Sequence, residues 1–174
     1  DGVMYLNKVL VSVKPFVSRK LVIKSGTKVI ADRACEGCKS LPSVTIPEGV
    51  KSIGEKAFEG CSSLKSVTIP EGVNSIGSYA FYNCSSLTSV TIPKSVTSIG
   101  ERAFYACSSL RSVTISEGVK SIGREAFHAC MSLKSVVWNA KNCQDIPHYY
   151  GTYGNQIFSN NITNFIVGGS VKQI

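Results

Sequence analysis

A repeat of 23 residues constrains what this 174-residue chain can fold into more than any other feature of its sequence. Leucine, valine, isoleucine, phenylalanine and cysteine recur at this interval, and one complete unit runs from Cys61 to Asn83. A unit this short cannot bury its apolar face alone, so neighbouring units must stack to form one core. The repeat therefore predicts a solenoid. The cysteine column of the repeat comprises Cys38, Cys61, Cys84, Cys107 and Cys130.

Each unit contains a short stretch in which apolar and polar residues alternate. After Leu64, the alternation turns Val67 and Ile69 inward. Ser66 and Thr68 then point to the opposite face. The proline that follows cannot donate a backbone hydrogen bond, so it marks the end of the strand. We therefore predict one strand per unit, stacked in parallel on one face of a right-handed solenoid.

The remainder of the unit predicts a corner and a turn. Val73 and Ile76 are expected to be buried, and Gly77 is expected to form a corner with a positive φ. The segment from Ala80 to Cys84 is too short for an independent helix and predicts one helical turn. The expected fold is a leucine-rich repeat solenoid of the α/β class, rich in strands with short helical turns.

The ends of the chain depart from the repeat. Apolar stretches at 3–6 and 9–13 predict a hairpin cap within residues 1–20, followed by regular repeats over 21–138. Residues 139–174 predict an irregular repeat with an inserted loop of about five residues and an incomplete last unit. We expect the natural protein to continue with further repeats or domains. No apolar run approaches the roughly 18 residues that span a bilayer, so membrane insertion is not expected in this segment.

The repeated unit is similar to the BspA-type leucine-rich repeat. The pattern C-S-S-L-x-S-V-T-I-P-x-x-V-x-S-I-G-x-x-A-F is nearly unchanged from Cys61 to Asn83 and from Cys84 to Ala106. The resemblance implies a bacterial cell-surface or secreted protein, with adhesion to host or matrix proteins, and it carries no catalytic motif. Departures from the pattern are Ala31, Cys35, Ser95, Ser116 and the insertion after Trp138.

The cysteines predict packing rather than chemistry. Equivalent cysteines in neighbouring units are close enough for a disulfide, but their parallel Cβ directions do not suit its dihedral angle. A metal array is the other functional interpretation, and a buried column of small apolar side chains is favoured over both. The pair Cys35 and Cys38 is the best redox or metal candidate, although Cys35 occupies a core phenylalanine position. Cys143 lies outside the pattern and is the thiol we expect to be exposed.

Nothing in the sequence predicts an enzyme, a cofactor or a metal site. The two histidines, His128 and His148, belong to no ligand or nucleophile motif. Cys143 and His148 lack the third group that orients a catalytic base.

Two outward surfaces are candidates for binding. The strand positions predict a flat hydroxyl face, suited to protein docking or to ice binding, unless Ser and Thr are simply good exposed strand residues. Tyrosines and a histidine predict a second column, which serves either an interface or stacking between units. The residues are Ser43, Thr45, Ser66, Thr68, Ser89, Thr91, Ser112 and Thr114 for the first surface, and Tyr79, Tyr82, Tyr105 and His128 for the second.

The net charge of +8 is concentrated near the start of the chain, where residues 1–40 carry eight Lys or Arg and three acids. This excess suits acidic glycans, anionic surfaces or nucleic acid, or is a solvated cap. Nucleic acid is not expected, because no aromatic residues are interleaved with the cations. The expected function is therefore a non-catalytic binding module for an extracellular protein or glycan, and the alternative is a structural spacer.

Overall fold

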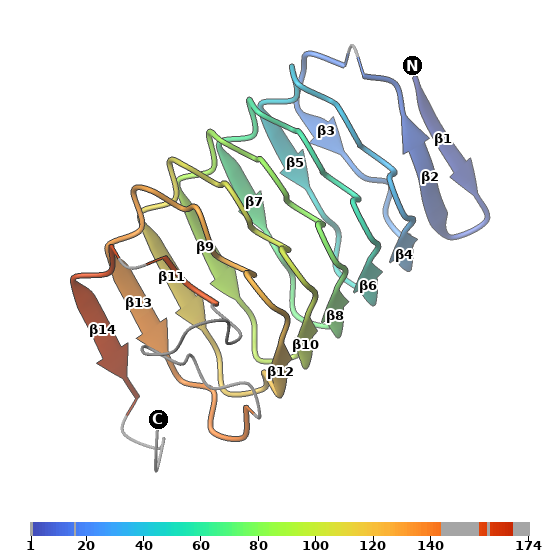
Figure 1. Ribbon diagram of the computed structural model, residues 1–174. Helices are drawn as coiled ribbons and strands as arrows, with labels where there is room; N and C mark the ends of the chain where they lie inside the picture. Colours follow the sequence, from blue (N-terminus) through green and yellow to red (C-terminus); the bar gives the residue numbers. More distant parts are fainter. Residues whose placement is uncertain (1, 16, 144–156, 160, 169–174) are drawn as a thin grey trace.

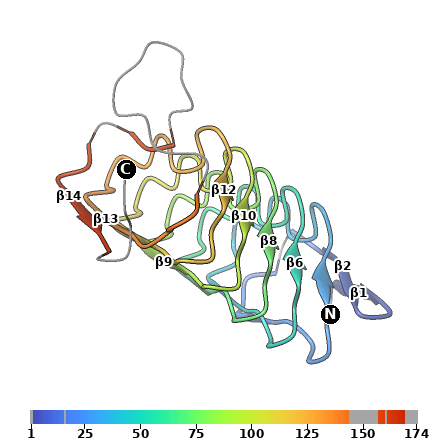
Figure 2. The same cartoon turned by 90° about the horizontal axis from the view of Figure 1, so that it is seen from below.

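The computed structural model describes residues 2–15, 17–143, 157–159 and 161–168, and it is a stack of coils that begins with a hairpin (Figure 1). Each regular coil contributes two short strands, and the two lines of strands run along separate sides of the stack (Figures 1 and 2). The predicted solenoid is confirmed.

The first line of strands is the one that the alternating pattern predicts. Val44, Val67 and Val90 are buried, whereas the flanking Thr45 and Thr68 are exposed, so the predicted alternation is confirmed. The strands pair in parallel, one unit apart, in the orders β3-β5-β7 and β9-β11-β13-β14. Their bounds are β3 (Leu21–Val22), β5 (Ser43–Thr45), β7 (Ser66–Thr68), β9 (Ser89–Ile92), β11 (Ser112–Ile115), β13 (Ser135–Trp138) and β14 (Asn164–Val167).

A second line of strands begins at the N-terminal hairpin, and its members beyond that hairpin were not predicted. Its members are β1 (Val3–Leu6), β2 (Val9–Val13), β4 (Val29–Ile30), β6 (Ser52–Ile53), β8 (Ser75–Ile76), β10 (Ser98–Ile99) and β12 (Ser121–Ile122), which form one sheet in the order β1-β2-β4-β6-β8-β10-β12. Parallel pairing one unit apart creates the two-residue strands, so their cause is the stacking itself. β1 and β2 form an antiparallel hairpin around Asn7-Lys8, and β2 covers the first coil by pairing with β4.

The predicted helical turns are wrong, and within the described residues the chain is all β. Tyr79 and Asn83 have positive φ angles of 58° and 56°, which a right-handed helix does not accommodate. Alternate amides in this segment donate to the next coil instead of along a helix; Phe81 N, for example, donates to Ala103 O at 2.7 Å. The amides between them close tight turns, as in the bond from Tyr82 N to Tyr79 O at 3.0 Å.

The corner glycines serve close packing rather than an unusual backbone angle, so the predicted positive φ at Gly77 is wrong. A Cβ atom added there would lie 2.6 Å from the backbone nitrogen of Glu55 and 2.6 Å from the carbonyl carbon of Gly54. Positive φ is found at Gly49 and Gly72 instead, at 91° and 103°, in the turns that follow the strands. Gly77 is therefore required because two coils touch at this corner.

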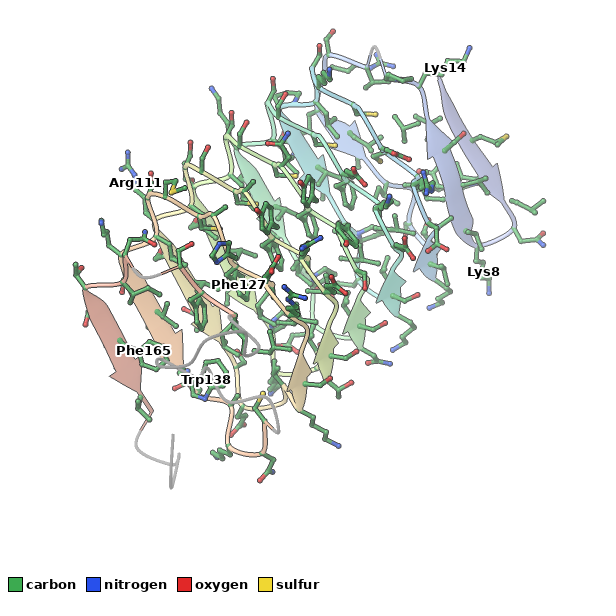
Figure 3. The ribbon with its side chains drawn as sticks, in the orientation of Figure 1. Lys8, Lys14, Arg111, Phe127, Trp138 and Phe165 are labelled. Atoms are coloured by element: carbon green, nitrogen blue, oxygen red, sulfur yellow. The ribbon has the colours of Figure 1, made fainter. Side chains whose placement is uncertain are left out.

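Phenylalanine rings fill the centre of the stack (Figure 3). Phe58, Phe81, Phe104 and Phe127 stack with centroids 5.0–5.1 Å apart and planes within 8° of parallel. Cys35 occupies the equivalent position in the first coil and is fully buried.

The last coil is longer than 23 residues but keeps the ring stacking and the strand pairing of the regular coils. Phe158 extends the ring column at 5.4 Å from Phe127, and Phe165 pairs with Val136, 29 residues earlier. The side-chain amide of Asn161 donates to the backbone carbonyls of Cys130, Met131 and Leu133. The predicted inserted loop falls mainly on residues 144–156, and the predicted end of the last unit falls on 169–174; both lie outside the described residues.

Candidate functional site

The outward face of β5, β7, β9 and β11 presents a regular array of hydroxyl groups. One column of serines and one of threonines follow the strands, with neighbouring rungs about 4.8 Å apart. Six of the eight side chains are exposed, and Ser43 and Thr114 are half-buried. We call this surface the hydroxyl face; it comprises Ser43, Thr45, Ser66, Thr68, Ser89, Thr91, Ser112 and Thr114.

The hydroxyl face is not used for hydrogen bonding within the described part of the protein. None of its eight hydroxyls bonds to another described residue. Hydroxyls at the neighbouring corner behave differently: Ser85 and Ser108 each donate to a carbonyl of the preceding coil, both at 3.4 Å. The hydroxyls of the face therefore keep their donors and acceptors for a partner or for water.

The threonine column continues into apolar residues at both ends. Val22 aligns with Thr45, and Val137 aligns with Thr114 and then with Ile166. Val22 is 64% exposed and Ile166 is 47% exposed. Every rung of the column is thus β-branched, so a stripe of methyl groups accompanies the hydroxyls.

One margin of the hydroxyl face is basic. Lys65, Arg111 and Lys134 occupy equivalent positions immediately before the strands and are all exposed; Arg111 projects from the edge of the stack (Figure 3). Glu48, Glu71 and Glu117 lie beyond the prolines and Ser116 at the far end of the strands. Net charge summed over stretches of sequence does not reveal this basic margin. It becomes evident when the charged residues at equivalent positions of successive units are compared.

The aromatic residues form a second column that is engaged within the protein. Tyr82 and Tyr105 stack at 5.2 Å with planes 5° apart, and His128 lies 5.8 Å from Tyr105. Tyr79 lies 5.7 Å from Tyr82, and its hydroxyl accepts a hydrogen bond from Arg102 at 3.3 Å. These contacts support the stacking interpretation of the column; its role in binding stays a prediction.

Arg102 is the centre of the charges around this column. Its guanidinium lies over the rings of Tyr79 and Tyr105 and donates to Glu125 at 2.6 Å. This hydrogen bond lowers the pKa of Glu125 below its ordinary value. Because the guanidinium is committed to these contacts, the column offers little charge to a partner.

The cysteine column is buried and hydrogen-bonded. The thiols of Cys61, Cys84, Cys107 and Cys130 donate to main-chain carbonyls of the preceding coil, 26 residues earlier, at 3.2–3.3 Å. Burial raises the pKa of Cys61 to about 12, and it also raises the pKa of Cys84. A hydrogen bond between the thiols of Cys35 and Cys38 raises the pKa of Cys35 and lowers that of Cys38, yet both are fully buried. Cys143 is half-buried.

Among the described residues, no group of three or more His, Cys, Asp or Glu side chains is placed to hold a metal ion. In that same part of the chain, no helix is both long and apolar enough to cross a bilayer. His148 lies outside the described residues, so its predicted lack of a catalytic role stays a prediction.

Comparison with protein families gives one match, to the BspA type leucine-rich repeat region, in six copies over residues 28–161. No curated protein matches the chain.

Solved structures of bacterial proteins have the same fold. A leucine-rich repeat protein of T. pallidum, TpLRR, is 29% identical, with a TM-score of 0.71 over 92% of this chain and 78% of the other. One from Bacteroides ovatus is 30% identical, with a TM-score of 0.72 over 84% of this chain. The pneumococcal vaccine antigen PcpA, at 20% identity and a TM-score of 0.75 over 93% of this chain, shares the fold. The chain spans 45% of each of the last two proteins.

Proposed function

Since the chain belongs to the BspA-type leucine-rich repeat family, we propose that it is a non-catalytic binding module that engages an extracellular macromolecule through the hydroxyl face. The observation that carries the proposal is the set of eight hydroxyls without a hydrogen bond to any described residue. Strands that pair as β5 with β7 and as β9 with β11 hold these groups in place, so binding does not require them to be ordered first.

The hydroxyl face suits this role better than the aromatic column does. The rings of Tyr82 and Tyr105 already cover one another, and Arg102 is already paired with Glu125. A ligand at that column would have to displace these contacts, whereas a ligand on the hydroxyl face displaces water alone. The hydroxyl face therefore has the lower cost of binding.

The proposed location is the cell surface or the medium outside a bacterial cell. The family resemblance supports this location. Antibody labelling of intact cells tests it: surface exposure gives labelling before permeabilisation, and labelling that requires permeabilisation contradicts it.

A panel of immobilised matrix proteins, mucin and glycans tests the binding function. The double variant Thr68→Glu with Thr91→Glu places two carboxylates in the middle of the hydroxyl face. The matched control, Ser75→Glu with Ser98→Glu, makes the same change on the outward side of β8 and β10 in the same two coils. We expect the first variant to lose the ligand of the native protein by at least about tenfold and the control to keep it.

The alternative function is a structural spacer that holds other domains apart. A spacer returns nothing above background from the whole panel. Equal loss of binding in both double variants would also contradict the proposed face. Circular dichroism of each variant confirms that the solenoid is folded before binding is compared.

A further inference from the structure

We infer that the ligand of the hydroxyl face is a linear acidic polysaccharide, lying along the stack with its sulfate or carboxylate groups against the basic margin. This inference rests on the proposed function and names the partner class of that face.

Charges are segregated by position within the unit. From its cysteine to the last residue of its strand pattern, each regular unit contains no Asp or Glu, and all eleven acids of the chain lie elsewhere. The same segments contribute four cations, Lys39, Lys65, Arg111 and Lys134. One edge of the stack is therefore positively charged without local compensation.

The cations of this edge are available to a ligand. Lys39, Lys65 and Arg111 are exposed and form no ion pair with a described residue. Lys134 is also exposed and donates to the backbone carbonyl of Asn161 at 3.3 Å, without a described acidic partner. By contrast, Arg33, Lys56, Arg102, Arg124 and Lys141 are paired with acids elsewhere.

The spacing of the groups fits a chain that runs along the stack. Thr88 separates Lys65 from Arg111 in the hydrogen-bonded column, so these two cations are two coils, about 10 Å, apart. A disaccharide of an extended polysaccharide has a comparable length and commonly carries one anionic group per repeat. The serine and threonine hydroxyls beside the cations can exchange hydrogen bonds with sugar hydroxyls.

A polysaccharide fits this surface better than a nucleic acid does. Single-stranded nucleic acid binding relies on aromatic side chains that stack on bases. The hydroxyl face has none, because Tyr79, Tyr82 and Tyr105 lie in the turn segments and pack against one another. Uncharged hydroxyls beside cations are instead what a hydroxylated, anionic chain requires.

The test is calorimetric titration of the protein, at about 0.15 M salt, with size-defined heparin and hyaluronan oligosaccharides, neutral dextran, polyglutamate and single-stranded DNA. We expect an acidic glycan to bind at least about tenfold more tightly than polyglutamate or DNA, and dextran not to bind. Heparin without hyaluronan indicates that sulfate is recognised; binding of both indicates that carboxylate suffices. Affinity is expected to fall as salt rises.

Matched charge-reversal variants locate the site. The triple variant Lys65→Glu, Arg111→Glu and Lys134→Glu is expected to lose glycan binding by at least about tenfold. Its control, Lys28→Glu, Lys51→Glu and Lys120→Glu, changes the net charge equally at exposed lysines beside the other sheet. We expect the control to lose less than about threefold.

Several outcomes overturn the inference. Equal losses in the two triple variants would reduce the effect to net charge, and tight binding of DNA or polyglutamate would contradict a glycan partner. No binding of either acidic glycan would also refute it. If the panel instead yields a neutral glycan or a protein whose binding is lost in the Thr68→Glu, Thr91→Glu variant, the proposed function stands and this inference alone fails.

Discussion

Two corners of each coil meet the same demand, close stacking, in different ways. At the glycine corner, four consecutive coils use the same residue, in the column Gly54, Gly77, Gly100 and Gly123. At the turn corner, one column of non-glycine residues adopts positive φ angles of 51–58°: Lys56, Tyr79, Arg102 and Glu125. A second column of this corner holds Gly37, Gly60, Asn83, Ala106 and Ala129.

The difference shows which constraint is stricter. A left-handed backbone angle costs a non-glycine residue about 1–2 kcal/mol, and the turn corner accepts this cost in several coils. A Cβ atom within 2.6 Å of a neighbouring coil cannot be accommodated at a comparable cost, because the backbones of the two coils would have to move apart. Contact between coils therefore restricts the sequence more than backbone conformation does.

The substitution Gly77→Ala is expected to have the largest effect. Overlap with the backbone of Glu55 and Gly54 should lower the free energy of unfolding by about 3 kcal/mol. Its control is Gly60→Ala, where the added Cβ has no neighbour closer than 3.8 Å and the cost of a positive φ alone, about 1 kcal/mol, is expected. Urea denaturation measures both, and equal losses would contradict the comparison.

Thiol labelling tests how tightly the coils pack at the turn corner, because Cys84 directly follows Asn83 and becomes accessible only if this corner opens. About one thiol of the native protein is expected to react, with Cys143 first, against seven after denaturation. Burial keeps the column thiols inaccessible, and it raises the pKa of Cys61 to about 12. Cys143→Ser should remove the fast reaction, and rapid native labelling of several column thiols would show that this corner opens.

Ala106→Gly should stabilise the protein by about 1 kcal/mol. Ala106 adopts a φ of 57°, which glycine accepts without a steric penalty, although the greater freedom of glycine in the unfolded chain offsets part of the gain. The control Ala103→Gly, at a buried position where φ is not positive, should destabilise. A loss of stability in both variants would mean that the turn corner tolerates alanine for another reason.

Glu125→Gln should have the smallest effect, and it should depend on pH. Arg102 lowers the folded-state pKa of Glu125, so this carboxylate stabilises the protein above its unfolded pKa, near 4, and the contribution is lost as pH falls through the lower folded value. The difference in thermal midpoint from the native protein is therefore expected at pH 7 and should shrink at lower pH. Glu55→Gln, at an exposed carboxylate without a described ion pair, should show little difference at either pH.

The repeat made most of the architecture predictable, because inward columns are chemically uniform. The strand at Ser66–Thr68, the buried Val67 and the cysteine column all follow from alternation and spacing. The strand at Ser75–Ile76 could not be predicted in this way, because two residues carry no periodicity and the pairing exists only once coils stack. The turn at Tyr79 was not predicted for a related reason. The amides of this segment donate to carbonyls of the next coil rather than within a local helix, and these acceptors are in place only once the coils stack.

The candidate face was predictable as a set of positions but not as a site. Alternation placed Ser66 and Thr68 outward, whereas the lack of a hydrogen bond from their hydroxyls to any described residue is a property of the folded stack. The basic margin was present in the sequence as the absence of acids between each cysteine and the end of its strand.

The hydrogen bonds between coils also have a fixed direction at each position around the coil. Amides of the turn corner, such as Phe81 N, donate toward the following coil, whereas amides beside the second sheet, such as Asn74 N to Lys51 O at 2.8 Å, donate toward the preceding one. These two sets of amides therefore point in opposite directions along the stack, whereas the amides of a helix all point the same way. The surface that a coil turns toward the following coil therefore carries donors at the turn corner and acceptors beside the second sheet. A further coil matches both sets of groups in a single orientation.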